Sequence, residues 1–317
     1  MRLFVCILLA ACTFAAAVPG QGNAARRDYL FEKNAARFAD IGKVTSRSFK
    51  FLARLNAGES MDASLERIAA LVVKAGETSG YAFTKPGKNN KAKHSLKRYY
   101  DTPDYALYAG GYVIREIYPY TKKNGPDPAV FSLTVKEMSP NDFERLARSP
   151  LASARKGGKI KFEENISWAP QGMRSYFEST ASAPADPAAL GRRTLGEYAK
   201  LYPALGRAGV AMDVPLAAFD AWSTEKKIGR FALPDGGAMD LVIEGWTRSR
   251  DGMPVLVGID MDLRGDKGYA ASPEQMKASE DFFSAVFVNA LKEQWLPGSE
   301  AFMGSKVRIL LDRKRGP

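Results

Sequence analysis

The chain has 317 residues, of which 45% are hydrophobic and 26% charged, and this is enough apolar material for one large core or two closely joined ones. Lysine and arginine number 46 against 35 aspartates and glutamates, so the formal net charge is +11 and an anionic partner is expected. A single histidine in a basic loop, His94, and only two cysteines exclude zinc sites built from these residues and a Ser-His-Asp triad.

The N-terminus predicts a secretory signal peptide over residues 1–24. Arg2 precedes an uncharged apolar run, residues 3–18, which is shorter than the roughly 20 residues that cross a bilayer as a helix, so no transmembrane anchor is expected. The residues before Cys12 also resemble a bacterial lipobox, which leaves a lipoprotein as the alternative. We therefore expect a secreted or periplasmic protein, without a disulfide because both cysteines lie in this segment.

The next segments predict a helical extension followed by a first strand. Residues 25–44 carry alternating charges and are expected to form an N-terminal helical addition to the fold. Residues 45–55 alternate with a period of two, which predicts a strand with Arg47 on one face and Lys50 and Arg54 on the other. A helix is expected directly after this strand.

Residues 97–115 form the most informative stretch of the sequence. A strand leads into the turn Asp-Thr-Pro-Asp at residues 101–104, which is followed by a short helical segment. Asp101 can accept local hydrogen bonds there, and Pro103 fits a first helical position. A pair of glycines then ends the segment before a second strand, which carries Arg115.

Further strands with alternating faces are predicted at residues 130–137, 159–168, 222–233 and 255–263, with a hairpin return after the third. Their polar faces mix cations and carboxylates. These residues are Lys136, Lys161, Glu163, Lys226, Arg230, Asp240, Glu244, Asp260 and Asp262. Glu164 falls on the apolar face of its strand and is expected at a rim.

The remaining segments are assigned by composition and periodicity. Residues 179–187, rich in alanine, proline and serine, are interpreted as a linker. Residues 272–296 predict the longest helix, residues 307–311 a final strand, and residues 313–317 a solvated basic tail.

The sequence Tyr-Asp-Thr-Pro-Asp at residues 100–104, with the leucine, glycine and Arg115 that follow it, resembles the signature of the CYTH proteins, the triphosphate tunnel metalloenzymes. This resemblance implies a closed antiparallel barrel that holds a polyphosphate chain in a charged lumen. We therefore expect an α+β protein, a closed antiparallel eight-stranded β-barrel with helices packed outside, as one tunnel domain over residues 45–312.

Two departures from the family pattern bear on its metal chemistry. Ser46, Ser48 and Lys50 fit the frame of the family's Glu-x-Glu-x-Lys motif, but both metal-binding glutamates of that motif are serine here. The second arginine of the family pattern, after Arg115, falls on Ile117. The chain therefore resembles the family with a degenerate metal motif.

The resemblance also places functional residues on the polar faces of the strands. The expected substrate-binding residues are Lys50, Arg54, Arg115, Lys136, Lys161, Lys226 and Arg230. The expected ligands of Mg²⁺ or Mn²⁺ are Glu163, Glu244, Asp260 and Asp262. The expected catalytic carboxylates are Glu163, Asp260 and Asp262.

Several functions remain open at this point. An extracytoplasmic protein could bind and hydrolyse a triphosphate or polyphosphate-type anion with a divalent metal, or it could bind the anion without catalysis, because Ser46 and Ser48 bring no charge to a metal. Nucleic acid is a disfavoured partner, since no familiar nucleic-acid-binding signature is present. An ordinary one-sided sheet, with its charged faces toward water, would also account for the alternation.

Overall fold

The computed structural model describes residues 28–37, 44, 46–87, 90–129, 131–139, 146, 151, 158–169, 172–185, 193–234, 236–264, 271–296 and 305–312. The predicted signal peptide, residues 1–24, and the predicted basic tail, residues 313–317, lie outside these ranges. The strands within them are β1 (Ser46–Ala53), β2 (Phe83–Thr84), β3 (Lys93–Asp101), β4 (Tyr112–Tyr120), β5 (Phe131–Ser139), β6 (Lys159–Ala169), β7 (Gly172–Ala185), β8 (Ala217–Ala232), β9 (Ala238–Thr247) and β10 (Pro254–Arg264).

Helical segments fill most of the longer connections. They are α1 (Leu30–Arg37), α2 (Met61–Thr78), α3 (Ala106–Ala109), α5 (Leu195–Leu201), the 3-10 segment η3 (Pro203–Arg207), α6 (Pro273–Val286) with its continuations η4 (Phe287–Leu291) and η5 (Lys292–Gln294), and α7 (Ser305–Asp312). Within the described residues, no helix is both long and apolar enough to cross a bilayer.

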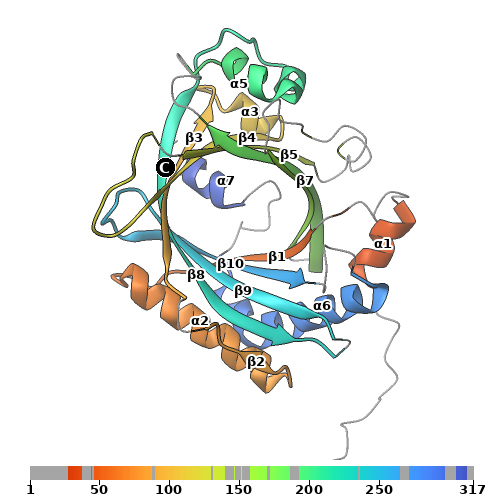
Figure 1. The fold of residues 1–317 in the computed structure, drawn as a ribbon. Coiled ribbons are helices and arrows are strands. Elements are labelled where there is room, and N and C mark those ends of the chain that lie inside the picture. Colours follow the sequence, from red (N-terminus) through yellow and green to blue (C-terminus); the bar gives the residue numbers. More distant parts are fainter. Residues whose placement is uncertain are drawn as a thin grey trace, which may run out of the picture.

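Nine strands close into a barrel in the order β8-β3-β4-β5-β7-β6-β1-β10-β9, and β9 pairs back with β8 (Figure 1). Neighbouring strands are antiparallel, except that β1 and β6 run parallel, with Ser46 opposite Glu163. The expected closed barrel with outer helices is confirmed, with nine strands instead of eight and one parallel pair. The β6–β7 hairpin explains both differences: because β7 pairs with β5, β6 is left to meet β1, whose direction it shares.

The outer face of the barrel is apolar and is covered by helices. Across β1, β9 and β10, helices α2 and α6 pack a core that includes Phe49, Ile68, Ile243, Ile259 and Phe283, all fully buried. Burying each side chain of this size contributes about 1.5–3 kcal/mol. The alternation that the sequence shows along these strands therefore places their apolar faces outward, against helices, and their charged faces inward.

Helices α3 and α5 with η3 cover the outer face over β3, β4 and β5. The turn before α3 is held by Asp101 as the sequence predicts, because the Asp101 carboxylate accepts hydrogen bonds from the backbone N–H groups of Thr102, Leu107 and Tyr108. Pro103 lies in this turn and not at the first helical position as predicted, since the N-cap of α3 is Tyr105. These bonds satisfy donors of the first helical turn, which would otherwise lack partners. Gly111, with a φ of 86°, then returns the chain into β4.

Helix α7 lies inside the ring of strands (Figure 1). Its side chains Val307, Leu310 and Leu311 pack against inward-facing residues of the wall, among them Tyr99 and Trp246. The prediction of a strand at residues 307–311 is therefore wrong. These apolar residues recur at helical spacing, and so short a run does not separate a helix from a strand.

The prediction of a linker at residues 179–187 is also wrong for its described part. Residues 179–185 form the second half of β7. All of them pair with β5, and residues 179–182 also pair with β6 on the other edge. Their side chains are small, and Ser179 and Ala181 are fully buried. Pairing with β5 along the whole segment, and with β6 along its first half, overrides the weak strand propensity of alanine and proline.

A buried ion network joins the outer face of β1 to α1 and α6. The Arg47 guanidinium donates to Glu164 of β6 at 2.7 Å and to Glu280 of α6 at 2.5 Å, and the Arg47 side chain is only 1% exposed. Glu280 also accepts the backbone N–H groups of Leu30 and Phe31 at the start of α1. Glu164 is therefore buried in this network and does not lie at a rim as predicted.

Replacing Arg47 by methionine is expected to destabilise the fold strongly. The substitution keeps the length of the side chain but leaves Glu164 and Glu280 buried without their cation, which typically costs about 3–5 kcal/mol. Urea unfolding followed by tryptophan fluorescence measures the loss.

Arg54→Met is the matched control for Arg47→Met. The Arg54 Nε donates only to a backbone carbonyl in an exposed position, so the control is expected to stay within about 0.5 kcal/mol of the wild type. An equal loss of stability in both variants would contradict the role of the buried network.

Candidate functional site

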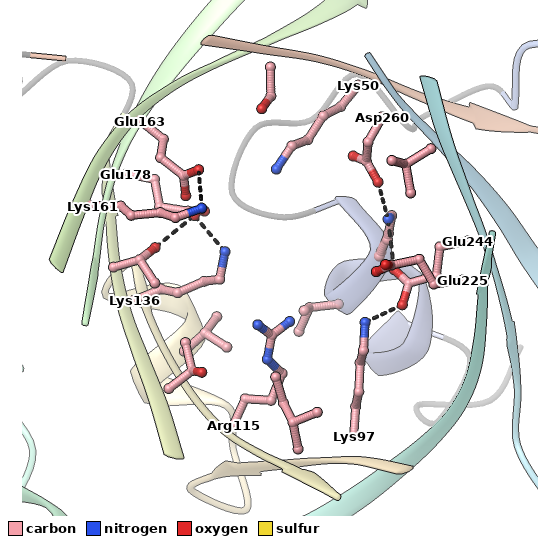
Figure 2. Close-up of a pocket in the computed structure, with 18 of the residues that line it drawn as sticks. Lys50, Lys97, Arg115, Lys136, Lys161, Glu163, Glu178, Glu225, Glu244 and Asp260 are labelled. Carbon is pink, nitrogen blue, oxygen red and sulfur yellow. Dashed lines mark hydrogen bonds and ion pairs between the residues drawn. The ribbon is translucent and has the colours of Figure 1, made fainter. Parts of the chain in front are cut away.

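The inward faces of the nine strands surround a lumen with a cavity of about 620 Å³ (Figure 2). Among the described residues, eight cationic side chains line it: Lys50, Lys93, Lys97, Arg115, Lys136, Lys161, Lys227 and Lys306. Seven carboxylates line it with them: Glu163, Glu178, Glu225, Asp240, Glu244, Asp260 and Asp262. The lumen is therefore densely charged but close to neutral.

Most of the site residues predicted from the sequence meet in this lumen. Those that line it are Lys50, Arg115, Lys136, Lys161, Glu163, Glu244, Asp260 and Asp262. They come from β1, β4, β5, β6, β9 and β10, so strands that are far apart in the sequence bring them to one cavity. Their roles as substrate, metal or catalytic residues stay predictions.

Two predicted substrate-binding residues lie away from the lumen. Arg54 follows β1 and donates to a backbone carbonyl in an exposed position. Lys226 pairs with Ile243, which belongs to the outer core, and its neighbour Lys227 lines the lumen. Because two lysines stand side by side in the sequence, the polar pattern alone did not decide which one points inward.

A third predicted substrate-binding residue, Arg230, lies at the end of β8. The strand bulges between Lys227 and Gly229, and this bulge shifts the alternation so that Arg230 pairs with Asp240. Its Nε donates to the Asp240 carboxylate at 2.7 Å, and its side chain is not among the described groups that line the cavity. A bulge of this kind leaves no clear mark in a single sequence.

Sequence reasoning missed several charged residues of the lumen, among them Lys97, Glu178 and Lys306. Lys97 is two residues from Tyr99, which also faces the lumen, so the alternation of β3 could have identified it. Glu178 directly precedes residues 179–187, which are predicted to be a linker, and Lys306 directly precedes residues 307–311, which are predicted to be a strand. Both were missed because the element that carries them was assigned wrongly.

One wall of the lumen carries a network of four charges. Lys97 donates to Glu244, Glu244 also accepts from Lys306 at 3.0 Å, and Lys306 donates to Asp260 at 2.8 Å (Figure 2). Burial would raise the pKa of Glu244, but the ammonium groups of Lys97 and Lys306 outweigh it and hold that pKa below its usual range. The pKa of Lys306 is raised in turn, since the two carboxylates outweigh its burial.

The facing wall carries a second charged group. Lys136 donates to Glu178 at 2.5 Å, and the Lys161 ammonium lies 3.7 Å from Glu163 (Figure 2). Burial would raise the pKa of Glu178, yet Lys136 and Lys50 hold it below its usual range. Both walls thus consist of carboxylates that are already neutralised by lysines.

Lys50 and Arg115 differ from the other cations of the lumen. Within the described part of the chain, no salt bridge joins either of them to a carboxylate. Burial would lower the pKa of Lys50, but surrounding groups, led by Tyr176 and Glu178, raise it, so its ammonium stays charged. Arg115 Nε and Trp246 Nε1 are buried donors with no hydrogen-bond partner among the described residues. These groups favour a ligand that is anionic and rich in acceptors.

The two serines of the degenerate motif make specific contacts. Ser46 donates to Glu163 at 2.7 Å, and Ser48 donates to Asp262. Burial raises the pKa of Asp262, and the nearby carboxylates add to this effect, while Ser48 opposes it. Two of the four expected metal ligands are therefore hydrogen-bonded to Ser46 and Ser48, which stand where the motif that the sequence resembles has glutamates.

The arrangement does not fit the divalent-metal site that the family resemblance implies. The other two expected ligands, Glu244 and Asp260, share the ammonium of Lys306. Across the described ranges, no group of three or more acidic, histidine or cysteine side chains is placed to hold a metal ion. The carboxylates therefore serve as partners of lysine and serine side chains.

The two ends of the lumen differ in character. Helix α7 occupies one end, where the surrounding wall is apolar. Toward the other end, the side chains of Lys93, Lys161 and Lys227 are 82%, 59% and 42% exposed. An anion that approached this mouth would meet these exposed cations first, and a positive potential of this kind raises the rate of association.

Glutamate at positions 46 and 48 is expected to create affinity for a divalent metal. Ser46 lies opposite Glu163 and Ser48 opposite Asp262, so Ser46→Glu/Ser48→Glu would set four carboxylates against one another on β1, β6 and β10. Calorimetric titration with Mn²⁺ is expected to show binding that the control variant, Ser46→Ala/Ser48→Ala, lacks. Equal binding by the two double variants would show that these positions do not decide metal affinity.

No family profile and no curated protein matches the sequence. In a comparison of structures, 18 chains of solved proteins match the fold. One is a protein from Hippeastrum that is described as an adenylyl cyclase with a dominant triphosphatase activity. It is 12% identical in sequence, with a TM-score of 0.39, and the match covers 80% of this chain and 91% of that one. Another is from Bacillus halodurans, named for adenylate cyclase, with 12% identity, a TM-score of 0.38, and coverage of 79% and 94%. These are structural matches to CYTH-like proteins, at low sequence identity.

Proposed function

We propose that the protein binds a triphosphate or polyphosphate-type anion in the barrel lumen. One observation carries the proposal: Lys50 and Arg115 line the lumen as cations that no described carboxylate neutralises through a salt bridge. A phosphate group carries negative charge and accepts several hydrogen bonds, so it would satisfy both cations and the buried donor Arg115 Nε. The tunnel fold supports this ligand class, because the lumen of CYTH-like barrels holds triphosphates.

A chain of phosphates suits this lumen better than a single phosphate. The cations recur from the exposed Lys161 at the mouth to the half-buried Lys50 and Arg115 and the buried Lys97, and each could contact a different phosphate of one linear anion. Contacts to several phosphates of one ligand also share a single loss of translational freedom, which favours the longer anion.

The contacts of the lumen carboxylates support binding of the anion without its hydrolysis. Each expected catalytic residue, Glu163, Asp260 and Asp262, already accepts a hydrogen bond from a lysine or serine side chain. The alternative is a phosphohydrolase that depends on Mg²⁺ or Mn²⁺. Phosphate release from tripolyphosphate with added metal tests it, and turnover that Asp260→Asn abolishes would favour the enzyme.

The proposed site of action is outside the cytoplasm, secreted or periplasmic. The signal-peptide pattern of residues 1–24 supports this proposal. Expression of the full chain in a bacterium, followed by fractionation and mass measurement of the mature protein, tests it. A lipid-modified N-terminus at Cys12 would favour the lipoprotein alternative.

The variants Lys50→Met and Arg115→Met are each expected to weaken tripolyphosphate binding by roughly 10- to 100-fold. Each removes a charged donor, and a hydrogen bond to a charged group is worth about 1.5–3 kcal/mol. Isothermal titration in the presence of EDTA measures the affinity. The wild-type affinity is also expected to fall with added salt, because the contacts are ionic.

Arg54→Met is the matched control for these lumen variants, since it removes a cation that lies away from the lumen. It is expected to leave the affinity for tripolyphosphate unchanged. If all three variants lost affinity equally, net charge and not the lumen would explain binding, and the proposed site would be wrong.

The affinity is also expected to fall as the pH rises from neutrality toward 10.5, the ordinary pKa of lysine. Burial lowers the pKa of Lys136, and although Glu178 opposes this effect, Lys50 and Arg115 add to it. A bound anion would raise this pKa again, so binding takes up a proton. The affinity is then greatest below the pKa of the free protein and is lost as the pH rises through it.

Calorimetric titrations at stepped pH test this dependence. Lys136→Met serves as the control, because the ionisation of the ligand acts equally on both proteins and cancels in the comparison. The decline between neutral and alkaline pH is expected to be smaller in this variant. Parallel pH profiles for the wild type and Lys136→Met would exclude Lys136 as the titrating group.

A further inference from the structure

Helix α7 carries one cation into the lumen. The Lys306 side chain is 17% exposed, and its Nζ lies 3.0 Å from Glu244 Oε2 and 2.8 Å from Asp260 Oδ2. The helix itself is held in place by Val307, Leu310 and the other apolar side chains that pack against the wall. The packing of α7 against the barrel wall therefore positions Lys306 next to these two carboxylates.

The wall leaves room for this side chain at Gly258. A Cβ atom at position 258 would lie 2.3 Å from Lys306 Cε and 2.9 Å from Lys306 Nζ. The Lys306 side chain therefore occupies the space that a side chain at position 258 would need. Gly258 lies opposite Glu244 in the β9–β10 register and two residues before Asp260. The carboxylate pair, the glycine and the lysine thus form one fitted arrangement.

This arrangement puts an ammonium where the sequence predicts a divalent cation. Glu244 and Asp260 are two of the four expected metal ligands, and Mg²⁺ in phosphate-binding sites usually takes one or two carboxylates and completes its shell with phosphate oxygens and water. Lys306 instead neutralises one of the two negative charges, and Lys97 neutralises the other. A divalent ion would then meet no net negative charge at this position.

We propose that Lys306 is a built-in cation that replaces a divalent metal between Glu244 and Asp260, so that the lumen binds its anion without metal. The inference rests on the proposed function for the identity of the anion. The pair of carboxylates, however, is predicted to select against metal whether or not the anion binds. Lys306 is then the residue that determines metal independence, and Gly258 is the residue that admits it.

The test compares the wild type with Lys306→Met under two conditions. In EDTA, tripolyphosphate is expected to bind the wild type roughly 10- to 100-fold more tightly than the variant, which has lost a charged donor. With Mn²⁺ present, the variant is expected to regain affinity, whereas the wild type should bind no better than in EDTA. A wild type whose affinity rises with Mn²⁺ would overturn the proposal.

A titration with Mn²⁺ alone, read by electron paramagnetic resonance, separates this inference from the proposed function. It needs no anion, and Lys306→Met is expected to bind Mn²⁺ where the wild type does not. If the variant binds no more Mn²⁺ than the wild type, the replacement of metal by Lys306 is refuted. If the wild type fails to bind tripolyphosphate in any condition, the proposed function fails instead.

Two further variants exclude loss of the fold as an explanation. Gly258→Ala displaces the Lys306 side chain without removing a charge, and it is expected to shift metal dependence in the same direction as Lys306→Met. Lys277→Met removes a lysine of α6 that pairs with Glu32 outside the lumen, and it should behave as the wild type. Thermal unfolding of each variant confirms that the proteins compared are folded. A Gly258→Ala protein that is folded and unchanged in metal dependence would contradict the fitted arrangement.

Discussion

The charges that face the barrel lumen can be buried only because they compensate one another. An isolated ion in a low-dielectric interior costs several kcal/mol, and here Glu244, Asp260 and Glu178 are each within hydrogen-bonding reach of a lysine. This constraint also explains why the outer face is so apolar. Since ions occupy the lumen beyond the apolar end that α7 fills, the large apolar core must form outside the barrel, between the strands and helices such as α2 and α6.

The parts of the fold that the sequence predicted share one property, which is that local chemistry alone specifies them. The alternation of β1 and β10 identifies Lys50 and Asp260 as residues of one face, whichever way that face points. The Asp101 turn is specified by a carboxylate and the backbone donors within seven residues of it. Local sequence does not specify that the charged faces point inward, and this expectation depended on the family resemblance.

The parts that the sequence did not predict depend on contacts between distant segments. Residues 179–185 form a strand because β5 pairs with all of them and β6 pairs with residues 179–182. Helix α7 is placed by an apolar wall drawn from strands along the whole barrel. The choice between Lys226 and Lys227 depends on the phase of β8, which a bulge changes after Lys227. No periodicity within these segments carries that information.

The position of α7 has a consequence for the geometry of recognition. A tunnel that is open at both ends can thread a polymer and hold any internal section of it, but here one end is occupied by Val307, Leu310 and their neighbours. A linear polyphosphate would then enter through the lysine-rich mouth with its terminus first. If the proposed ligand is a long polyphosphate, the lumen would bind its ends and not its interior, so one polymer would hold at most two copies of the protein, one at each end, however many phosphates lie between them.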